Sequence, residues 1–588
     1  MKRGFLYFLF KPFRISLKYF FLKISSLVFE GFYPLLEVFA FTFLIDECIK
    51  IKTHGFTYIT YTAIFFFFTL IAFKYFFSYI IKFSSFREIK KINLKLNESF
   101  IKKLSMLEYE YLEDSNSYDR IQILKKELLN KFLSKHTSLL SGFKILFQLT
   151  SIMIIVFSAM QFKGIIILLA VAAVVFISAY NGKKNYEQKH ETAFLDRKAD
   201  YYSDVLSKPE FTVERKIFNY AKYINKKFET VNKILISEEA KIKLKNMFRM
   251  ESSSFFTLMI FIYFIISLSQ SVVTGSISIG LLIATVKQLQ NFLEIIRWDL
   301  YSILETKSEI KNYLNDLNEF YNYREISAAS EISDINTEDN MQDIIKITDL
   351  NFAYPKTEKL VFKNLNFTFK KNKTYAIVGE NGRGKSTLIK LLLGLYKDYE
   401  GEILLCGKPI SQTPQKIISK KFSVVFQDYA HYYLTLKENI LIGNLQANED
   451  TIQQAISLFS LDKVLTSLNE LAVLNKGDNF NADLSGGQWQ NLALARSYIG
   501  NGEILIFDEP TASLSPMQET KIYTFLKDIT KNKTAIFISH RLGIAPLVDE
   551  ILLLKDGYIL ERGSHEELIA NKSSVYYSMY NTQKELYV

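Results

Sequence analysis

The sequence predicts a multidomain protein in which an all-α domain of six transmembrane helices, with long cytoplasmic helix extensions, is followed by an α/β domain. Three observations support this. The chain has 588 residues, enough for several domains. Long apolar runs occur only before about residue 320, whereas short strand-like and helix-like patterns alternate from residue 344 onward. Residues 379–387 read GENGRGKST, a glycine-rich loop between an apolar strand-like run and an apolar helical run.

The first domain is expected to cover residues 1–320. A spanning helix needs roughly 20 mainly apolar residues. Six segments meet this, near 17–45, 57–82, 138–160, 162–180, 254–274 and 277–297. Basic residues at the N-terminus and in the intervening segments predict that both termini are cytoplasmic. The abundance of Lys, Ile, Asn and Phe is typical of a low-GC bacterium, so we expect a multi-pass protein of the bacterial cytoplasmic membrane.

Two long segments between the apolar runs, about 84–135 and 183–250, read as helices that continue past the bilayer, with one clear break at Pro209. Each antiparallel helix pair would then end in a short turn. The candidate turns are Tyr109–Tyr118 and Ser207–Phe211, and we expect them to touch a soluble domain. The alternative is a solvated charged helix that contacts nothing.

Charged residues inside apolar spans are rare and suggest function. Glu30 and Glu37 share one face of the first span, Lys74 lies in the second, and Glu294 and Arg297 lie near the end of the sixth. One interpretation is an acidic stripe that lines a water-filled path for a cationic cargo. The other is internal pairing, for instance of Glu37 with Lys74.

Residues 321–343 are polar and acidic, so they are expected to form a linker before an α/β domain over 344–588 with a mostly parallel sheet. The two cysteines, Cys48 and Cys406, lie in different domains, so no disulfide is expected. The net charge of +11 lacks an accompanying cluster of basic and aromatic residues, so no nucleic-acid partner is expected.

The glycine-rich loop fits the P-loop NTPase pattern, in which backbone N–H groups wrap the β-phosphate. Lys385 would reach the β and γ oxygens, and the Ser386 hydroxyl would ligate Mg²⁺. A chance glycine loop is the bland alternative, but the flanking strand and helix patterns speak against it. The expected nucleotide-binding residues here are Gly379, Glu380, Asn381, Gly382, Arg383, Gly384, Lys385, Ser386 and Thr387.

Residues 503–510 read EILIFDEP, an apolar strand that ends in two acids. A carboxylate at a strand end beside a phosphate loop normally orders Mg²⁺, which assigns Asp508 as a metal ligand. The adjacent Glu509 is placed to polarise the attacking water.

Residues 484–488 read LSGGQ, which resembles the signature motif of the ABC transporter ATPases. The whole chain resembles an exporter-type half-transporter of this family, with six spans before one ATPase domain. The resemblance implies that Tyr354 stacks on adenine and that His540, in FISHR, contacts the γ-phosphate. It also implies that Gln427, in VVFQD, meets the γ-phosphate side and Mg²⁺. Its signature residues are Ser485, Gly486, Gly487 and Gln488.

The resemblance further implies a dimer that buries two ATP molecules between facing subunits. The signature loop of one subunit would cap the nucleotide held by the other, and closure would switch a membrane cavity from inward-open to outward-open. Since one chain carries nearly every element of a site, a homodimer is favoured. A heterodimer stays open because Ser515 stands where the family usually has Asp.

Two departures from the family pattern carry expectations. With Ser515 in PTASLSP, ATP hydrolysis is expected to persist with weaker coupling between the two sites, because the phosphate loop and Glu509 are intact. The stretch GDNFNAD, at 477–483, replaces a Gly-Glu-x-Gly turn that contacts the membrane domain in exporters.

Three spellings, FQDYAHYYLTLKENI, LSGGQWQ and DEPTASL, are similar to exporters of ribosomally made peptides, including lantibiotics. The leading hypothesis is therefore ATP-driven export of a lantibiotic- or bacteriocin-like peptide, with membrane lipid as a further partner. The second is the same architecture moving drugs or lipids. The third is a membrane scaffold for peptide-modifying enzymes regulated by ATP binding, which an intact Glu509 disfavours because a scaffold needs no general base.

Overall fold

The computed structural model groups the chain into two compact units. The helical unit comprises Met1–Ser105 and Asn116–Tyr323, and the α/β unit comprises Met106–Ser115 and Arg324–Val588. A short segment of the membrane half thus belongs to the α/β unit. The structure describes residues 5–130, 132–160, 194–295, 299, 301–326, 342–380, 382–467, 472–474, 484–510 and 516–585.

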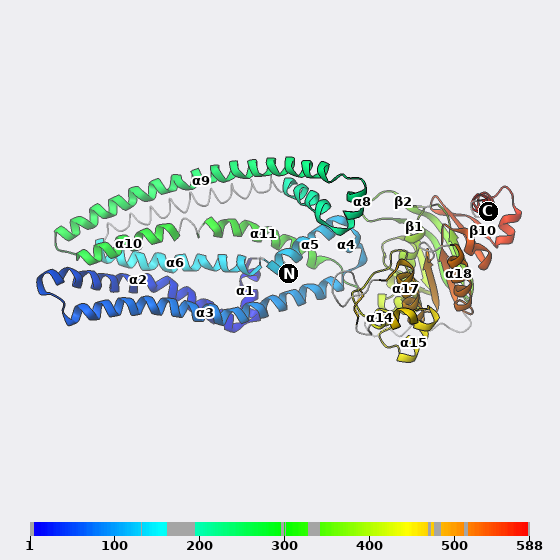
Figure 1. Ribbon diagram of the computed structural model, residues 1–588, viewed down its shortest axis with the longest axis horizontal. Coiled ribbons are helices and arrows are strands. Elements are labelled where there is room, and N and C mark those ends of the chain that lie inside the picture. The colour runs from blue at the N-terminus through cyan, green and yellow to red at the C-terminus, as the bar shows by residue number, and fades with distance from the viewer. Residues whose placement is uncertain are drawn as a thin grey trace. The chain divides into compact units, whose positions relative to one another are not determined.

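The helical unit consists of long helices that run side by side (Figure 1). Three of them, Leu17–His54, Tyr58–Ser105 and Phe132–Ser158, are long and apolar enough to cross a membrane. The fifth predicted span falls within α9 and most of the sixth within α10, while the fourth, 162–180, lies outside the described residues. The helices are α1 (Phe5–Ile15), α2 (Leu17–His54), α3 (Tyr58–Ser105), α5 (Ser115–Asn130), α6 (Phe132–Met160), residues 194–207, η2 (Pro209–Phe211), α8 (Thr212–Ile217), α9 (Ala221–Val273), α10 (Ile279–Ile295) and α11 (Tyr301–Asn322).

The predicted extension of the helices past the bilayer is confirmed. Helix α3 has 48 residues and α9 has 53. At about 1.5 Å per residue they measure roughly 70–80 Å, against about 30 Å of hydrocarbon. The break at Pro209 is also found, since this residue opens the short η2.

Close packing fixes α2 against α6. A side chain at Gly31 would place its Cβ 2.3 Å from Phe147 Cβ, so only glycine fits there. The approach lets the Ser151 hydroxyl donate to the Gly31 carbonyl at 2.7 Å. Small residues at a contact between apolar helices allow the backbones to approach in this way.

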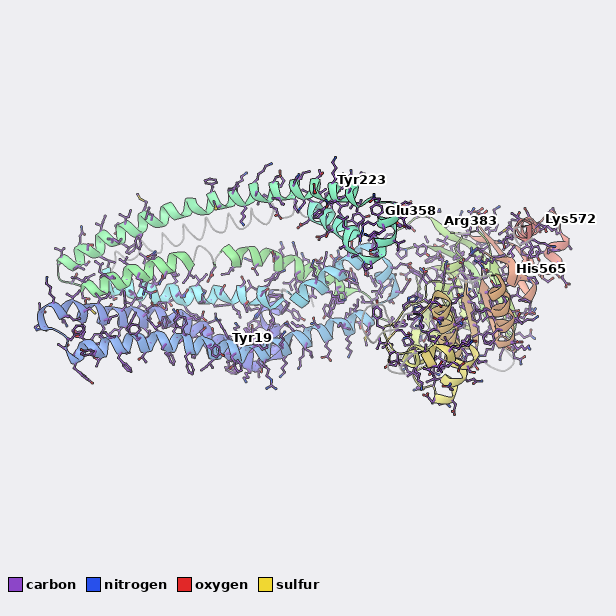
Figure 2. All side chains as sticks on the ribbon, viewed as in Figure 1. Tyr19, Tyr223, Glu358, Arg383, His565 and Lys572 are labelled. Atoms are coloured by element: carbon purple, nitrogen blue, oxygen red, sulfur yellow. The ribbon has the colours of Figure 1, made fainter. Side chains whose placement is uncertain are left out.

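Helix α1, at the N-terminus, packs against other helices of the helical unit. His136 is fully buried, with Nε2 3.0 Å from the Leu9 carbonyl. Tyr19, labelled in Figure 2, is also fully buried. Ser16 caps α2 and donates to Glu88 of α3 at 2.8 Å, which joins the entry of α2 to α3.

The α/β unit confirms the predicted fold class. A six-stranded sheet has the order β10-β9-β3-β8-β7-β6, parallel except for β10, and an antiparallel four-stranded sheet has the order β2-β1-β4-β5. The strands are β1 (Asp343–Ala353), β2 (Leu360–Lys370), β3 (Thr374–Val378), β4 (Glu400–Leu405), β5 (Lys408–Pro409), β6 (Phe422–Val425), β7 (Ile504–Asp508), β8 (Thr534–Ile538), β9 (Glu550–Lys555) and β10 (Tyr558–Gly563).

Each central strand is buried on both faces, which explains its unbroken apolar run. In β3, for instance, Tyr375 and Ile377 enter one buried cluster and Ala376 and Val378 the other. The remaining elements of this unit are α4 (Tyr109–Glu113), α12 (Lys385–Leu392), η4 (Ile410–Gln412), α13 (Gln415–Lys421), α14 (Leu436–Leu441), α15 (Glu449–Leu458), α16 (Asp462–Ser467), α17 (Gly486–Gly500), α18 (Pro516–Ile529), η5 (Leu542–Leu547), α19 (His565–Ala570) and α20 (Val575–Glu585).

Candidate active site

The strand order brings the predicted site residues to one edge of the sheet. Strands β3, β8, β7 and β6 are parallel neighbours, so their carboxyl ends meet. The glycine-rich loop follows β3, His540 follows β8, Asp508 and Glu509 end and follow β7, and Gln427 follows β6. Ligands in open α/β sheets bind at such an edge.

The glycine-rich loop turns sharply between β3 and α12. Gly379 has φ +154°, and a Cβ there would lie 2.5 Å from the Leu554 carbonyl oxygen, so a side chain cannot enter. Gly384, with φ +95°, precedes α12, whose first turn points free N–H groups into the loop. This is the arrangement that binds phosphate.

Lys385 lies inside the loop and is 6% exposed. Its Nζ donates to the carbonyls of Gly379 at 2.6 Å and Glu380 at 2.9 Å. Burial lowers the pKa of Lys385, while the nearby Glu509 and Asp508 raise it. A buried ammonium held only by loop carbonyls suits an incoming phosphate, whose oxygens can replace those acceptors.

Asp508 carries the feature that fits a cation. Its Oδ1 is buried and has no hydrogen-bond partner among the described residues. Burial raises its pKa to about 6, with its hydrogen bond to Ser386 acting in the opposite direction. A hydroxyl and an unsatisfied carboxylate side by side are the hard oxygen ligands that Mg²⁺ prefers, so these residues fit the metal predicted from the sequence.

Glu509 follows Asp508 with φ 50°, an uncommon value outside glycine. Its amide donates to the Ile538 carbonyl at 2.9 Å, which fixes this conformation. His540 Nδ1 lies 2.9 Å from Glu509 Oε1. The predicted general base and the predicted γ-phosphate contact are thus in direct contact.

His540 is held from behind by the last helix. Gln583 of α20 donates through Nε2 to the His540 carbonyl at 2.6 Å and accepts from the Leu542 amide at 2.9 Å. No motif marked Gln583 in the sequence. The two bonds fix the backbone that carries the imidazole.

Gln427 is exposed just after β6. The segment that follows is braced on α17. The rings of His431 and Trp489 stack at 4.1 Å with 3° between planes. Arg496 donates to the Ala430 carbonyl at 2.7 Å. The spelling FQDYAH and the helix after the signature are therefore joined by direct contacts.

Tyr354, the residue expected to stack on adenine, lies beside the core of the α/β unit. It is partly buried against the core, with Tyr396 at 5.6 Å in an edge-on contact. Its hydroxyl lies 2.7 Å from Thr387 Oγ1 on α12. This bond ties the ring expected to stack on adenine to the helix that follows the phosphate loop.

Two further loop residues are bound to each other. Arg383, labelled in Figure 2, donates to Glu380 Oε2 at 2.6 Å and to Asp556 at 2.6 Å. Asn381 lies outside the described residues, and its role stays a prediction. Arg383 and Glu380 therefore brace the rim of the loop.

The signature residues open α17. Ser485 caps the helix, accepting from the Gln488 amide at 3.3 Å while Gln488 Oε1 accepts from the Ser485 amide at 2.8 Å. Gly486 is exposed and Gly487 half-buried. Within the described part of the chain, no hydrogen bond or ion pair joins 484–488 to 379–387. The capping box engages the Ser485 and Gln488 amides, and among the described residues no hydrogen bond engages the amides of Gly486 and Gly487.

The first predicted turn does contact the soluble domain. Helix α4 lies in the α/β unit, where Glu113 accepts from Lys390 at 2.6 Å and from the Tyr396 hydroxyl, and Asp114 pairs with Lys356 at 2.7 Å. Arg324 pairs with Glu108, Glu110 and Asp398 at 2.8–3.1 Å. Exposed pairs contribute roughly 0.2–1 kcal/mol each, so docking depends on their sum.

The charges inside the spans are paired differently from the expectation. Glu37 lies 3.4 Å from Lys287 rather than beside Lys74. Lys74 instead lies 4.4 Å from the centre of the Tyr33 ring. The side chains of Glu294 and Arg297, together with Ser515 and residues 477–483, lie outside the described part of the chain.

Comparison with known proteins agrees with this geometry. Residues 362–512 match the family model described as ABC transporter. The chain is 28% identical to the subtilin transport ATP-binding protein of Bacillus subtilis, over 92% of this chain and 88% of that protein. It is 28% identical to the nisin transport ATP-binding protein of Lactococcus lactis subsp. lactis, over 84% and 82%. A bacterial Atm1-family ABC exporter with ATP bound shares the fold, with TM-score 0.75, 20% identity and coverage of 95% and 98%.

Proposed function

The chain belongs to the ABC transporter family, and from this premise we propose that it exports a ribosomally made peptide of the lantibiotic or bacteriocin type. The observation that supports a peptide as the cargo is the match to the subtilin transport protein over 92% of the chain, which includes the membrane half. The nisin transport protein adds a second match of the same kind. The family and the exporter fold alone would suit drugs or lipids equally well.

The chain is an ATPase. We assign a separate role in nucleotide binding or hydrolysis to each predicted residue at the sheet edge. In our proposal Tyr354 stacks on adenine, Lys385 and the loop amides hold the β- and γ-phosphates, and His540 contacts the γ-phosphate. Glu509 takes a proton from the water that attacks the γ-phosphorus, and ADP leaves. Ser386, Asp508 and Gln427 would hold Mg²⁺, which when bound neutralises charge on the β- and γ-phosphates.

One ATPase unit per chain implies dimerisation, as in half-transporters. We propose a homodimer in which Ser485, Gly486, Gly487 and Gln488 of one copy cap the nucleotide on the other. The free N–H groups at the start of α17 support this, because such groups bind anions. We further propose the bacterial cytoplasmic membrane as its location, with both termini, the 321–343 linker and the 344–588 domain on the cytoplasmic side.

Peptide uptake into liposomes that contain the purified chain, with its ATPase domain facing outward, tests the function. Purified chain in liposomes, with ATP outside, should accumulate a co-encoded precursor peptide, and Glu509→Gln should slow hydrolysis by about 10²–10⁴-fold while ATP still binds. Lys385→Ala should abolish both ATP hydrolysis and peptide uptake.

Two outcomes would contradict the proposal. Drug-stimulated ATPase without peptide uptake would identify a drug or lipid exporter. Peptide export that survives in Glu509→Gln would show that hydrolysis does not drive it, as expected of a scaffold.

A further inference from the structure

The helical unit contains a partly open cavity of about 670 Å³ that is lined by residues of α2, α3, α6 and α10. This volume is within the range of about 300–1,000 Å³ typical of small-ligand sites. Phe29, Tyr33 and Phe77 give it aromatic walls. It therefore has room for a ligand the size of a few amino-acid residues.

Charges of both signs line the cavity. Three are acids and three are lysines: Glu30, Glu37, Asp299, Lys74, Lys82 and Lys144. Asp299 pairs with Lys144 at 2.9 Å, and Glu37 pairs with Lys287 at 3.4 Å. Glu30 and Glu37, the two acids of the stripe considered from the sequence, both line the cavity, but lysines share the wall, so the lining is mixed.

Three of these charges, Glu30, Lys74 and Lys82, form no ion pair with another described residue, although Lys23 is near enough to Glu30 for their charges to interact. Glu30 accepts a hydrogen bond from Ser26 at 2.8 Å, and among the described residues no lysine or arginine forms an ion pair with it. In the same part of the chain no acid pairs with Lys74 or Lys82, and Lys74 lies over the Tyr33 ring. Charged groups within apolar helices that lack partners are expected to serve a ligand.

Two glutamines add unsatisfied amide groups to the same wall. Gln148 is 7% exposed and Gln288 is 5% exposed. Gln148 Oε1 and Gln288 Nε2 have no hydrogen-bond partner in the described structure, which is rare for buried polar atoms. One is an acceptor and the other a donor. Neighbouring side chains cover these atoms, so a ligand reaches them once the amide turns towards the cavity.

We propose that this cavity binds a short peptide segment that carries a basic and an acidic group with amide bonds between them. The basic group would pair with Glu30, the acidic group with Lys74 or Lys82, and the backbone amides with Gln148 and Gln288. A lipophilic cation would leave the lysines unpaired, and a lipid tail would leave every polar group unpaired. The proposal rests on the proposed peptide export and names the chemistry of its cargo.

Three hexapeptides of equal length, each acetylated at the N-terminus and amidated at the C-terminus so that the termini carry no charge, test this with the full chain in nanodiscs. One contains Lys, Glu and two Phe; in the second Gln replaces the Glu; in the third Gln replaces the Lys. Fluorescence anisotropy should show that the first binds about tenfold more tightly than either other. If the parent protein binds all three peptides with equal affinity, the proposal is overturned without any variant.

Variants then assign the residues. Glu30→Gln should remove the advantage given by the probe's lysine and leave the lysine-free probe within twofold of its parental affinity. The double variant Lys74→Gln, Lys82→Gln should remove the gain in affinity given by the probe's glutamate and leave the affinity of the glutamate-free probe within twofold of the parental value. Glu47→Gln is the matched control, since Glu47 lies on the same helix, pairs with Lys50 at 2.7 Å and does not line the cavity.

The remaining outcomes separate this site from the proposed function. If Glu30→Gln and Glu47→Gln change binding equally, or tetraphenylphosphonium competes as well as the doubly charged probe, the site is wrong. If Glu30→Gln, Lys74→Gln and Gln288→Leu export the precursor peptide at parental rates, peptide export stands and this cavity is not its binding site. If the parent chain exports no peptide, the proposed function falls, while the binding titrations still decide the cavity.

Discussion

Lys385 and Asp508 show how single residues prepare the site for a charged ligand. The lysine ammonium is buried against carbonyls, and the carboxyl keeps one buried oxygen without a partner. Both arrangements are costly in isolation, because burying a polar or charged group without a good partner is unfavourable. In the proposed function a phosphate and its cation would relieve both, so binding energy would be gained at the place where the reaction occurs.

Gln583 should act as a positioning residue for His540. Replacing it with Leu removes both bonds to the segment 540–542, so the imidazole loses its fixed place. We expect kcat to fall about three- to tenfold, the size of one or two net hydrogen bonds, with KM for ATP changed less than twofold. Steady-state phosphate release measures both.

The conservative variant Gln583→Glu keeps the acceptor for the Leu542 amide and should recover part of kcat. A fall in KM and kcat together, or full activity of Gln583→Leu, would contradict this role.

The two cysteines should differ in reactivity. Burial raises the pKa of the Cys406 thiol, and that side chain is 7% exposed, whereas Cys48 is exposed. Since the thiolate is the reactive form, iodoacetamide at pH 8 should label Cys48 and leave Cys406 unmodified until the protein is denatured. Peptide mass spectrometry gives both rates, and similar rates would refute the buried position of Cys406.

At the scale of elements, α4 and α17 each contact, directly or through one residue, a segment that contains a predicted nucleotide-site residue. Tyr396 contacts both Tyr354 and Tyr109, so the ring expected on adenine and the docked turn share a neighbour. The stack of His431 on Trp489 links the segment after Gln427 to the signature helix. Through these contacts, we expect a movement of either helix to displace residues of the proposed nucleotide site.

Glu113→Gln should weaken the docking of α4, because the charge that holds Lys390 and the Tyr396 hydroxyl is lost. We expect basal ATP hydrolysis within about threefold of the parent, with peptide-stimulated hydrolysis and export strongly reduced. Parallel ATPase and vesicle-export assays measure this.

Glu98→Gln is the matched control for that variant. Glu98 lies on the exposed surface of α3. Equal effects of the two variants, or normal export by Glu113→Gln, would argue against a role for the turn.

Sequence reasoning located the elements with strong local patterns and missed those made by distant contacts. The GENGRGKST loop and the strand ending in Asp508 were predictable because each needs its own residues in a fixed local conformation. Gln583, Glu113 and Arg324 were not, since each is an ordinary polar residue whose partners lie far along the chain. The length of α2 was underestimated, because hydropathy detects only the apolar part of this helix, which runs to His54 rather than to about residue 45.

At the scale of the whole molecule, the proposed capping of one copy's nucleotide by the other copy's signature predicts that a complete site needs two copies. Lys385→Ala destroys one half of each site and Ser485→Arg the other half, so either variant alone should be inactive. When both are co-expressed, mixed dimers keep one intact site and should restore roughly a quarter of parental hydrolysis, assuming random pairing and additive sites. Phosphate release from the co-expressed mixture measures this, and the purified mixed dimer, freed of the inactive pairs, should reach about half of the parental rate.

No recovery from a verified mixed dimer would mean that each chain completes its own site or that both sites must function together. Replacing Ser515 with Asp separates these two readings. We expect stronger cooperativity in ATP concentration, with turnover maintained; a fall in turnover would contradict the expectation that hydrolysis tolerates Ser515.

The membership of Met106–Ser115 in the α/β unit has a consequence for synthesis. Glu113 and Lys390 are 277 residues apart in the chain. At about 5–20 residues per second, the ribosome needs on the order of 14–55 s to make the lysine after the glutamate. During that interval the nascent α4 lacks its partner residues. The helices encoded between Glu113 and Lys390 are therefore made before the contact of α4 with the α/β unit can form. A C-terminal fragment expressed alone would in turn lack the strip that covers Tyr396.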